Sequence, residues 1–214
     1  MKLLLVFLAA TVILAGTENE FLRWDAKRAI STVAAQRATG DVGRNLDFRV
    51  IRTDRSINYK LRATWLTPDV IRASARLEQI KMTLTNEETL KLVADAEAVG
   101  DTVILVELDP REGSGVIPID WTATLSPRSG ASATLRIARG ASVPRLRELP
   151  ALVGFGRRDY AYDIFWVVCP LSTANGDQLF RAEDLEAELS VRIYDKVGKV
   201  RWPIPNSIRD RSHK

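Results

Sequence analysis

Two alternating segments near the end of the chain constrain the fold most strongly. Residues 188–194 and 199–202 each alternate apolar with polar side chains, which is the pattern of a strand with one buried face. Between them lies the short glycine-containing segment 195–198, so together they predict a β-hairpin. The two strands of a hairpin run antiparallel, and an antiparallel sheet is therefore the starting expectation for the whole chain.

Other segments add strands and helices to this hairpin. Strands are expected at 46–52, 59–65, 80–84, 102–108, 119–125, 133–138 and 160–168. The β-branched run 102–108 and the aromatic run 160–168 are predicted to be central strands. Thr67-Pro68 is a helix-start signal for a helix over 69–79, and Thr85 or Asn86 begins a second helix over 86–99, which Gly100 ends.

These elements predict a mainly β fold of the α+β class. We expect an antiparallel sandwich or a partly open barrel with two inserted helices and a short N-terminal helix. Helices do not alternate regularly with the strands, so a doubly wound parallel sheet is not expected. The expected organisation is a secretory signal or short anchor at 1–16, an amphipathic helix and linker at 17–43, a β-rich domain at 44–206 and a polar, frayed tail at 207–214.

The first 16 residues have the pattern of an export signal. Lys2 precedes an apolar run from residue 3 to residue 15 that is interrupted only by Thr11 and ends in small residues. The run is shorter than the roughly 20 residues of a membrane-spanning helix. Leu14-Ala15-Gly16 resembles the start of a bacterial lipoprotein box, but Thr17 stands where the lipid-carrying Cys would be. We therefore expect export, with cleavage near Ala15 or Gly16 or retention as an uncleaved anchor.

Thr17 also has a purely structural interpretation. Thr17 and Glu20 have the spacing of a capping box, and an apolar stripe at helical spacing follows them. This pattern predicts a helix from 18 to 38 that ends at Gly40, with a turn at 41–45. The two interpretations are compatible, because a helix can begin just after a cleavage site.

Composition places the remainder of the chain among globular proteins. The 214 residues are 46% hydrophobic and 27% charged, which suits one domain. The single cysteine, Cys169, excludes an intrachain disulfide, so stability must come from an apolar core. Cys169 lies in an apolar run and is expected to be a buried small hydrophobe.

Charge is nearly balanced overall but uneven along the chain. The formal net charge is +4, which does not indicate a nucleic-acid-binding face. Residues 44–81 carry nine basic and four acidic side chains, residues 87–112 carry two and eight, and residues 128–158 carry seven and one. These blocks could pair with one another across the fold, which we favour, or form a dipolar surface for a charged partner.

The sequence contains few residues that could act in catalysis. The single histidine, His213, is the second-last residue, where no packing would hold it as a general base, so histidine-based hydrolysis and His–Cys metal sites are not expected. We expect no cofactor and no metal ion. Carboxylate pairs could still perform acid–base chemistry on a glycan, and the candidates are Asp159 with Asp163 and Glu107 with Asp109.

One loop offers candidate binding residues. Gly154-Phe155-Gly156-Arg157-Arg158 places an aromatic side chain between two glycines beside a basic pair, which could meet an anion or a partner surface. With the acidic pair next to it, the candidate binding residues are Phe155, Arg157, Arg158, Asp159 and Asp163. The expected function is a non-catalytic binding or assembly role in the bacterial envelope, with an envelope protein or an anionic surface group as partner. The alternative is a carboxylate-dependent hydrolase acting on a cell-wall glycan.

Overall fold

Eight antiparallel strands form the main body of the protein. The computed structural model describes residues 19–43, 59–100, 102–110, 120–128, 136–152 and 164–209. In these ranges the strands follow the order β1-β2-β3-β6-β5-β4-β7-β8. Their bounds are β1 (Arg37–Val42), β2 (Tyr59–Trp65), β3 (Val103–Pro110), β4 (Trp121–Pro127), β5 (Ala138–Ser142), β6 (Ile164–Val168), β7 (Glu186–Ile193) and β8 (Lys196–Pro203). The predicted mainly β, antiparallel fold is confirmed.

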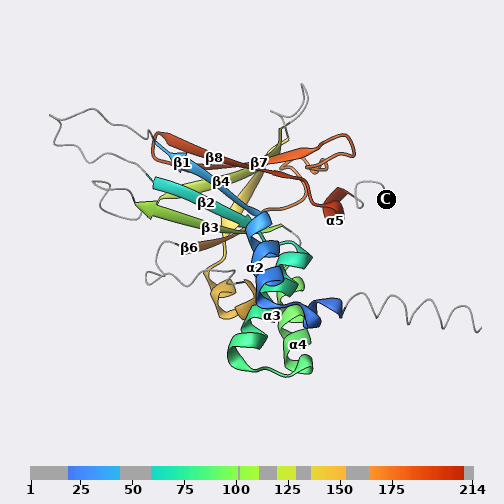
Figure 1. The fold of residues 1–214 in the computed structure, drawn as a ribbon. Helices are drawn as coiled ribbons and strands as arrows, with labels where there is room; N and C mark the ends of the chain where they lie inside the picture. The colour runs from blue at the N-terminus through green and yellow to red at the C-terminus, as the bar shows by residue number, and fades with distance from the viewer. Residues whose placement is uncertain are drawn as a thin grey trace, which may run out of the picture.

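The two outermost strands approach each other, so the sheet curls into a nearly closed barrel (Figure 1). Glycine makes this approach possible. A Cβ built on Gly198 of β8 would lie 2.7 Å from the carbonyl oxygen of Asp41 in β1, and a Cβ on Gly40 of β1 would collide with the backbone of Lys199. Backbones can come this close only where side chains are missing. Of the two architectures expected, the structure has the barrel.

Strand alternation separates the two faces of the barrel wall. Leu61, Ala63 and Trp65 of β2 point into the barrel core, and the side chains of the alternate residues point outward. β3 is buried on both faces over most of its length. Its residues Ile104 and Val106 join the barrel core, whereas Val103 and Leu105 join a second apolar cluster beneath the helices. This two-sided burial explains why 102–108 is so continuously apolar.

The helices gather on one side of the strands (Figure 1). They are α2 (Ala26–Ala35), α3 (Pro68–Met82), α4 (Asn86–Glu97) and the short α5 (Asn206–Arg209). Thr67 caps α3, and Thr85 with Glu88 forms a full capping box on α4, as the sequence indicated. The apolar residues of α2, α3 and α4 pack with the outer face of β3 and β6 into the second cluster, whereas Ile208 of α5 packs in the barrel core.

Several segments differ from the sequence-based expectation. The helix expected over 18–38 is wrong in extent: a 3-10 turn η1 (Glu20–Arg23) precedes α2, which Asp25 caps through the backbone N–H of Arg28 at 2.7 Å. Residues 37–42, expected as helix end and turn, pair with β2 as strand β1. Partners far along the chain decide this pairing, so local periodicity did not reveal it.

Two smaller expectations also fail. Ile80 to Met82, expected to begin a short strand over 80–84, form the last turn of α3. Ile208, expected in a frayed tail, is buried in α5 against the barrel core. The strand expected at 46–52 lies outside the described residues, as do the leader and residues 133–135 of the strand expected at 133–138. The last residue of that expected strand, Ala138, begins β5.

Candidate binding sites

Most candidate residues from the sequence lie outside the described ranges. Phe155, Arg157, Arg158, Asp159 and Asp163 all belong to this group, so their predicted role stays a prediction. Glu107 and Asp109 are described, and they lie on the outer face of β3 beside two arginines.

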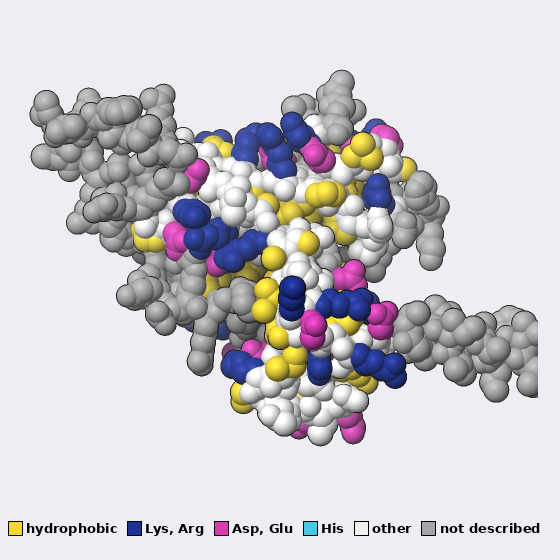
Figure 2. Space-filling view, viewed as in Figure 1, with side chains coloured by type: hydrophobic (Ala, Val, Ile, Leu, Met, Phe, Trp, Pro, Cys, Tyr) yellow, Lys and Arg dark blue, Asp and Glu magenta, His cyan; other side chains and the backbone are white. Residues whose placement is uncertain are grey.

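These four side chains form a charged cluster on β1–β3. Arg37 of β1 binds the carboxylate of Glu107, and Arg62 of β2 lies 2.9 Å from the carboxylate of Asp109. The register explains the meeting, because Arg62 is directly opposite Glu107 in the β2–β3 pairing. Basic and acidic side chains stand beside each other over the strands in Figure 2. The Arg62–Asp109 pair joins the first two charge blocks of the sequence, as does the pair between Arg72 and Glu97.

Burial dominates the electrostatics of Glu107. Its side chain is 7% exposed, and this desolvation raises its pKa above the usual value. Arg37 and Arg62 oppose the shift, and the nearby charge of Asp109 adds to it. The ion pair is therefore too desolvated to keep the pKa of this carboxyl in its ordinary range.

A pH dependence of stability follows from this shift. The unfolded chain releases the Glu107 proton near pH ~4.3, but the folded chain holds it to higher pH. The stabilisation is complete below the unfolded pKa and is lost as pH rises through the folded pKa. We expect the free energy of unfolding of Glu107→Gln, relative to the unmodified chain, to rise as the pH increases above the unfolded value of about 4.3. Urea titrations at each pH measure it, and a flat difference would contradict the shift.

One hollow on the described surface is an apolar groove. It measures about 720 Å³ and lies between the C-terminal end of α4, the ends of β5 and β6, and the 3-10 turn η3 (Pro144–Glu148). This volume is in the range of ordinary ligand pockets. We call it the apolar groove; its lining includes Ala98, Val99, Ala141, Val143, Leu149 and Val168.

Charged side chains of both signs line the groove. Arg145 and Glu148 are exposed, and the structure gives neither side chain an ion pair or hydrogen bond with any described residue. Asp95, also in the lining, is 2.7 Å from Lys91 and is thus already neutralised. An apolar floor with two uncompensated charges of opposite sign favours binding of an apolar group with charges beside it.

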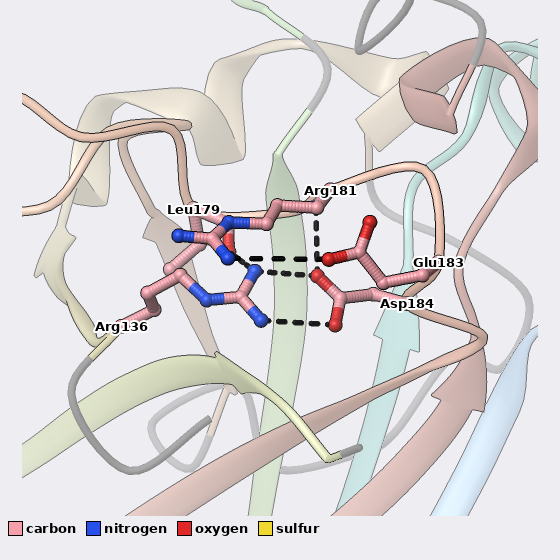
Figure 3. Close-up of polar contacts among 5 residues, drawn as sticks. All are labelled: Arg136, Leu179, Arg181, Glu183 and Asp184. Atoms are coloured by element: carbon pink, nitrogen blue, oxygen red, sulfur yellow. Dashed lines mark hydrogen bonds and ion pairs between the residues drawn. The ribbon is translucent and has the colours of Figure 1, made fainter. Parts of the chain in front are cut away.

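A buried ion pair holds the loop that leads into β7. Arg136 donates to both carboxylate oxygens of Asp184 at 2.5 and 3.0 Å and to the carbonyl of Leu179 at 3.1 Å (Figure 3). The backbone N–H of Arg181 donates to the same carboxylate at 2.7 Å. Burial favours a raised pKa for Asp184, but these hydrogen bonds and the arginine charges outweigh it and lower the pKa. The arrangement has a structural role, and we call the ion pair of Arg136 and Asp184 with these hydrogen bonds the clamp.

Cys169 is a buried core residue, as expected from its apolar context. Burial raises the pKa of its thiol to about 12. A thiol held in this protonated state is a poor nucleophile. Cys169 therefore contributes packing to the barrel core.

No group of three or more potential metal-ligating side chains occurs within the described ranges. In the same part of the chain, the helices lack the length and apolar character needed to cross a membrane. Comparison of the chain with protein-family models, with curated proteins and with solved structures found no match.

The sequence-based reasoning missed the residues of the groove. In the sequence, Arg145 stands out only as part of the basic block 128–158, and no local pattern assigns residues 144–152 to a helix or strand. A sequence signal for a packed 3-10 turn was available here. Pro144 stands at its start, and the apolar residues Leu146 and Leu149 follow three residues apart. That turn and the end of α4 line the same groove, a long-range arrangement that no local pattern reveals.

Proposed function

We propose that this protein is an exported bacterial envelope protein whose barrel domain has a non-catalytic binding or assembly role. The observation that carries the proposal is the apolar groove with its unneutralised Arg145 and Glu148. Charges that have no partner within the described protein are available to a binding partner, and apolar floor residues supply the area that stabilises the complex. Export rests on the pattern of the leader.

Site-specific photocrosslinking in living cells tests the binding role. A photoreactive amino acid placed at Ala141 lies in the groove lining, and one placed at the 62% exposed Leu185 serves as control. We expect a discrete adduct from position 141 and none from position 185. High salt during binding assays should weaken the interaction, because rim charges contribute to it. The absence of any adduct from position 141 would contradict the proposal.

Fractionation of the same cells tests export. We expect the protein in the periplasmic or membrane fraction, with its first residue near Thr17 if the leader is cleaved. Full-length protein dissolved in the cytoplasm, Met1 included, would contradict the export half of the proposal.

The alternative function is hydrolysis of a cell-wall glycan by a carboxylate pair. The raised pKa of Glu107 beside Asp109 favours it, because a general acid must be protonated when it acts and a raised pKa extends the pH range in which it is. Residues two apart on one strand face are separated by ~7 Å, which suits an inverting mechanism. Replacing the members of the catalytic pair by their amides, either Glu107→Gln with Asp109→Asn or Asp159→Asn with Asp163→Asn, should then abolish glycan release. Unchanged release by purified variants would contradict this alternative.

A further inference from the structure

A polar face lies on the outside of the barrel, over β5, β4 and β7. Alternate residues of these strands fill the barrel core, so the residues between them point outward. In the pairing register, Arg139 of β5 is opposite Thr124 of β4, and Thr124 is opposite Ser190 of β7. One step along the strands, Thr122 of β4 is opposite Arg192 of β7. We call these five residues the outer polar face.

Neither arginine of this face has a counter-ion in the described part of the chain. Arg139 and Arg192 are exposed, and their side chains make no ion pair or hydrogen bond with any described residue. Two strand spacings and one step of two residues separate them, which is roughly 12 Å between their Cα atoms. The residues opposite Arg192 are Thr122 and Val197, and neither carries a charge. Both guanidinium groups are therefore accessible to an anion from solution.

Hydroxyl groups lie between the two arginines. Thr122, Thr124 and Ser190 make no side-chain hydrogen bond with the residues that the structure describes. A hydroxyl donates one hydrogen bond and accepts others, as the hydroxyls of a sugar also do. Cations on both sides of a row of hydroxyls match a ligand in which anionic groups are joined by hydroxyl-bearing units.

The adjoining strand adds to the positive charge of this side of the barrel. Lys199 and Arg201 of β8 both donate to the single carboxylate of Glu188 in β7, at 2.6 and 2.9 Å. Two cations and one carboxylate leave an excess of one positive charge there. Together with Arg139 and Arg192, this surface carries four cations and one carboxylate. Such an excess attracts an anionic ligand before any contact is made.

We propose that the outer polar face binds an acidic oligosaccharide, a chain of sugars that carries carboxylate or phosphate groups. Arg139 and Arg192 each bind one anionic group, because a guanidinium presents two parallel N–H donors to such a group. The hydroxyls between them bind the hydroxyls of the sugars. This face shares no residue with the lining of the apolar groove, and the inference rests on the proposed function only for its setting in the envelope.

Two other classes of macromolecule fit this face less well. The centre of a protein interface is apolar and rich in aromatic side chains, whereas the centre here consists of Thr124 and Ser190. Single-stranded nucleic acid requires aromatic side chains on which its bases stack. The outward positions of β4, β5 and β7 include no aromatic residue. Hydroxyls flanked by arginines therefore favour a glycan.

Isothermal titration calorimetry of the full-length chain tests the proposal. The probes are oligogalacturonate, which carries carboxylates, and pentamannosyl phosphate, which carries a phosphate. Fully methyl-esterified oligogalacturonate is the matched control, because it has the same sugar chain without the charge. We expect at least one acidic probe to bind, with an affinity that falls as salt is added, and the ester to bind about 10-fold or more weakly than the acid.

Substitutions of arginine locate the binding. Arg139→Ala and Arg192→Ala should each raise the dissociation constant of the acidic probe by about 10-fold or more, since each removes charge-assisted hydrogen bonds. Arg128→Ala is the charge-matched control. Arg128 is also exposed, but it is paired with Glu186 outside the outer polar face, so its loss should change the dissociation constant by less than about 2-fold.

A third variant tests the role of the hydroxyls. Replacing Thr122 and Thr124 together by Val keeps the β-branched shape of both side chains and removes both hydroxyls. The dissociation constant of the acidic oligosaccharide should rise by about 5-fold or more, since neutral hydrogen bonds are lost. Binding of inorganic polyphosphate, which offers anionic groups without sugar hydroxyls, should not change. Circular dichroism verifies that every variant is folded.

Four results would overturn the inference. They are no binding of either acidic probe, equal losses from Arg128→Ala and Arg192→Ala, tighter binding of polyphosphate or duplex DNA than of both acidic oligosaccharides, and unchanged oligosaccharide binding by the double Val variant. The photocrosslinking at Ala141 separates this inference from the proposed function, because it tests the groove. An adduct from position 141 without any oligosaccharide binding would support the proposed function and overturn only this inference.

Discussion

Replacing Asp184 by Ala should lower the free energy of unfolding by about 3–5 kcal/mol. The side chains of Arg136 and Asp184 are 7% and 1% exposed, so the substitution leaves a guanidinium charge in the interior without its counter-ion. It also removes the acceptor of the Arg181 N–H. Urea unfolding measures the effect as a lower midpoint with an unchanged slope, which marks a change in stability alone.

An exposed ion pair nearby provides the matched control. Arg128 and Glu186 join the segment after β4 to the start of β7, but both side chains are more than 40% exposed. Glu186→Gln should therefore cost less than about 1 kcal/mol. Replacing Arg136 by Met and Asp184 by Leu together should restore most of the stability lost in Asp184→Ala, since no charge stays buried. Equal urea midpoints for Asp184→Ala and Glu186→Gln would contradict this prediction, because they would show that the ion pair of Arg136 and Asp184 is exposed to solvent.

The same clamp has a pH signature opposite to that of Glu107. The folded-state pKa of Asp184 is lowered, so its stabilising contribution is complete above the unfolded value near ~3.9 and is lost as pH falls through the folded pKa. Glu107 loses its contribution as pH rises. The contributions of these two carboxyls to stability thus change in opposite directions with pH. Asp184 has enough hydrogen-bond donors to offset its burial, and Glu107 does not.

Local patterns in the sequence predicted the elements whose stability is local. Thr67 and Thr85 cap their helices through their own neighbours, and residues 188–202 form a hairpin across a short turn. Short-range hydrogen bonds and alternation determine such features, so they can be inferred without the tertiary fold. The hairpin turn is tighter than expected, because Lys196 to Gly198 already belong to β8.

Elements that depend on distant partners were not predictable in this way. Residues 37–42 lack a clear strand pattern and become β1 because β2 offers a free edge to pair with. The local sequence favours a helix stop at Gly40, yet this residue lies at the crossing of β1 and β8. The groove and the clamp likewise join residues from separate segments, as Arg136 and Asp184 illustrate. The charge blocks indicated which regions of the chain are basic or acidic but not which side chains form ion pairs.

Replacing Gly198 by Ala should lower the free energy of unfolding by about 1–3 kcal/mol. The added methyl group would lie 2.7 Å from the carbonyl oxygen of Asp41 and 2.5 Å from a methyl carbon of Val42. A backbone oxygen cannot rotate away as a flexible side chain can, so β1 and β8 must separate. Because these strands are the two ends of the sheet, separation opens the barrel along its only unpaired edge among the described strands.

The neighbouring residue gives the control for this effect. Val197 is also in β8 but is 39% exposed, so Val197→Thr keeps the β-branched shape and should change stability by less than about 0.5 kcal/mol. Hydrogen exchange locates the damage: in Gly198→Ala the amides of β1 and β8 should exchange faster, while those of α3 and α4, which pack in the separate helical cluster, should not. A Gly198→Ala protein as stable as the unmodified chain would mean that β1 and β8 do not touch in solution and that the barrel is open.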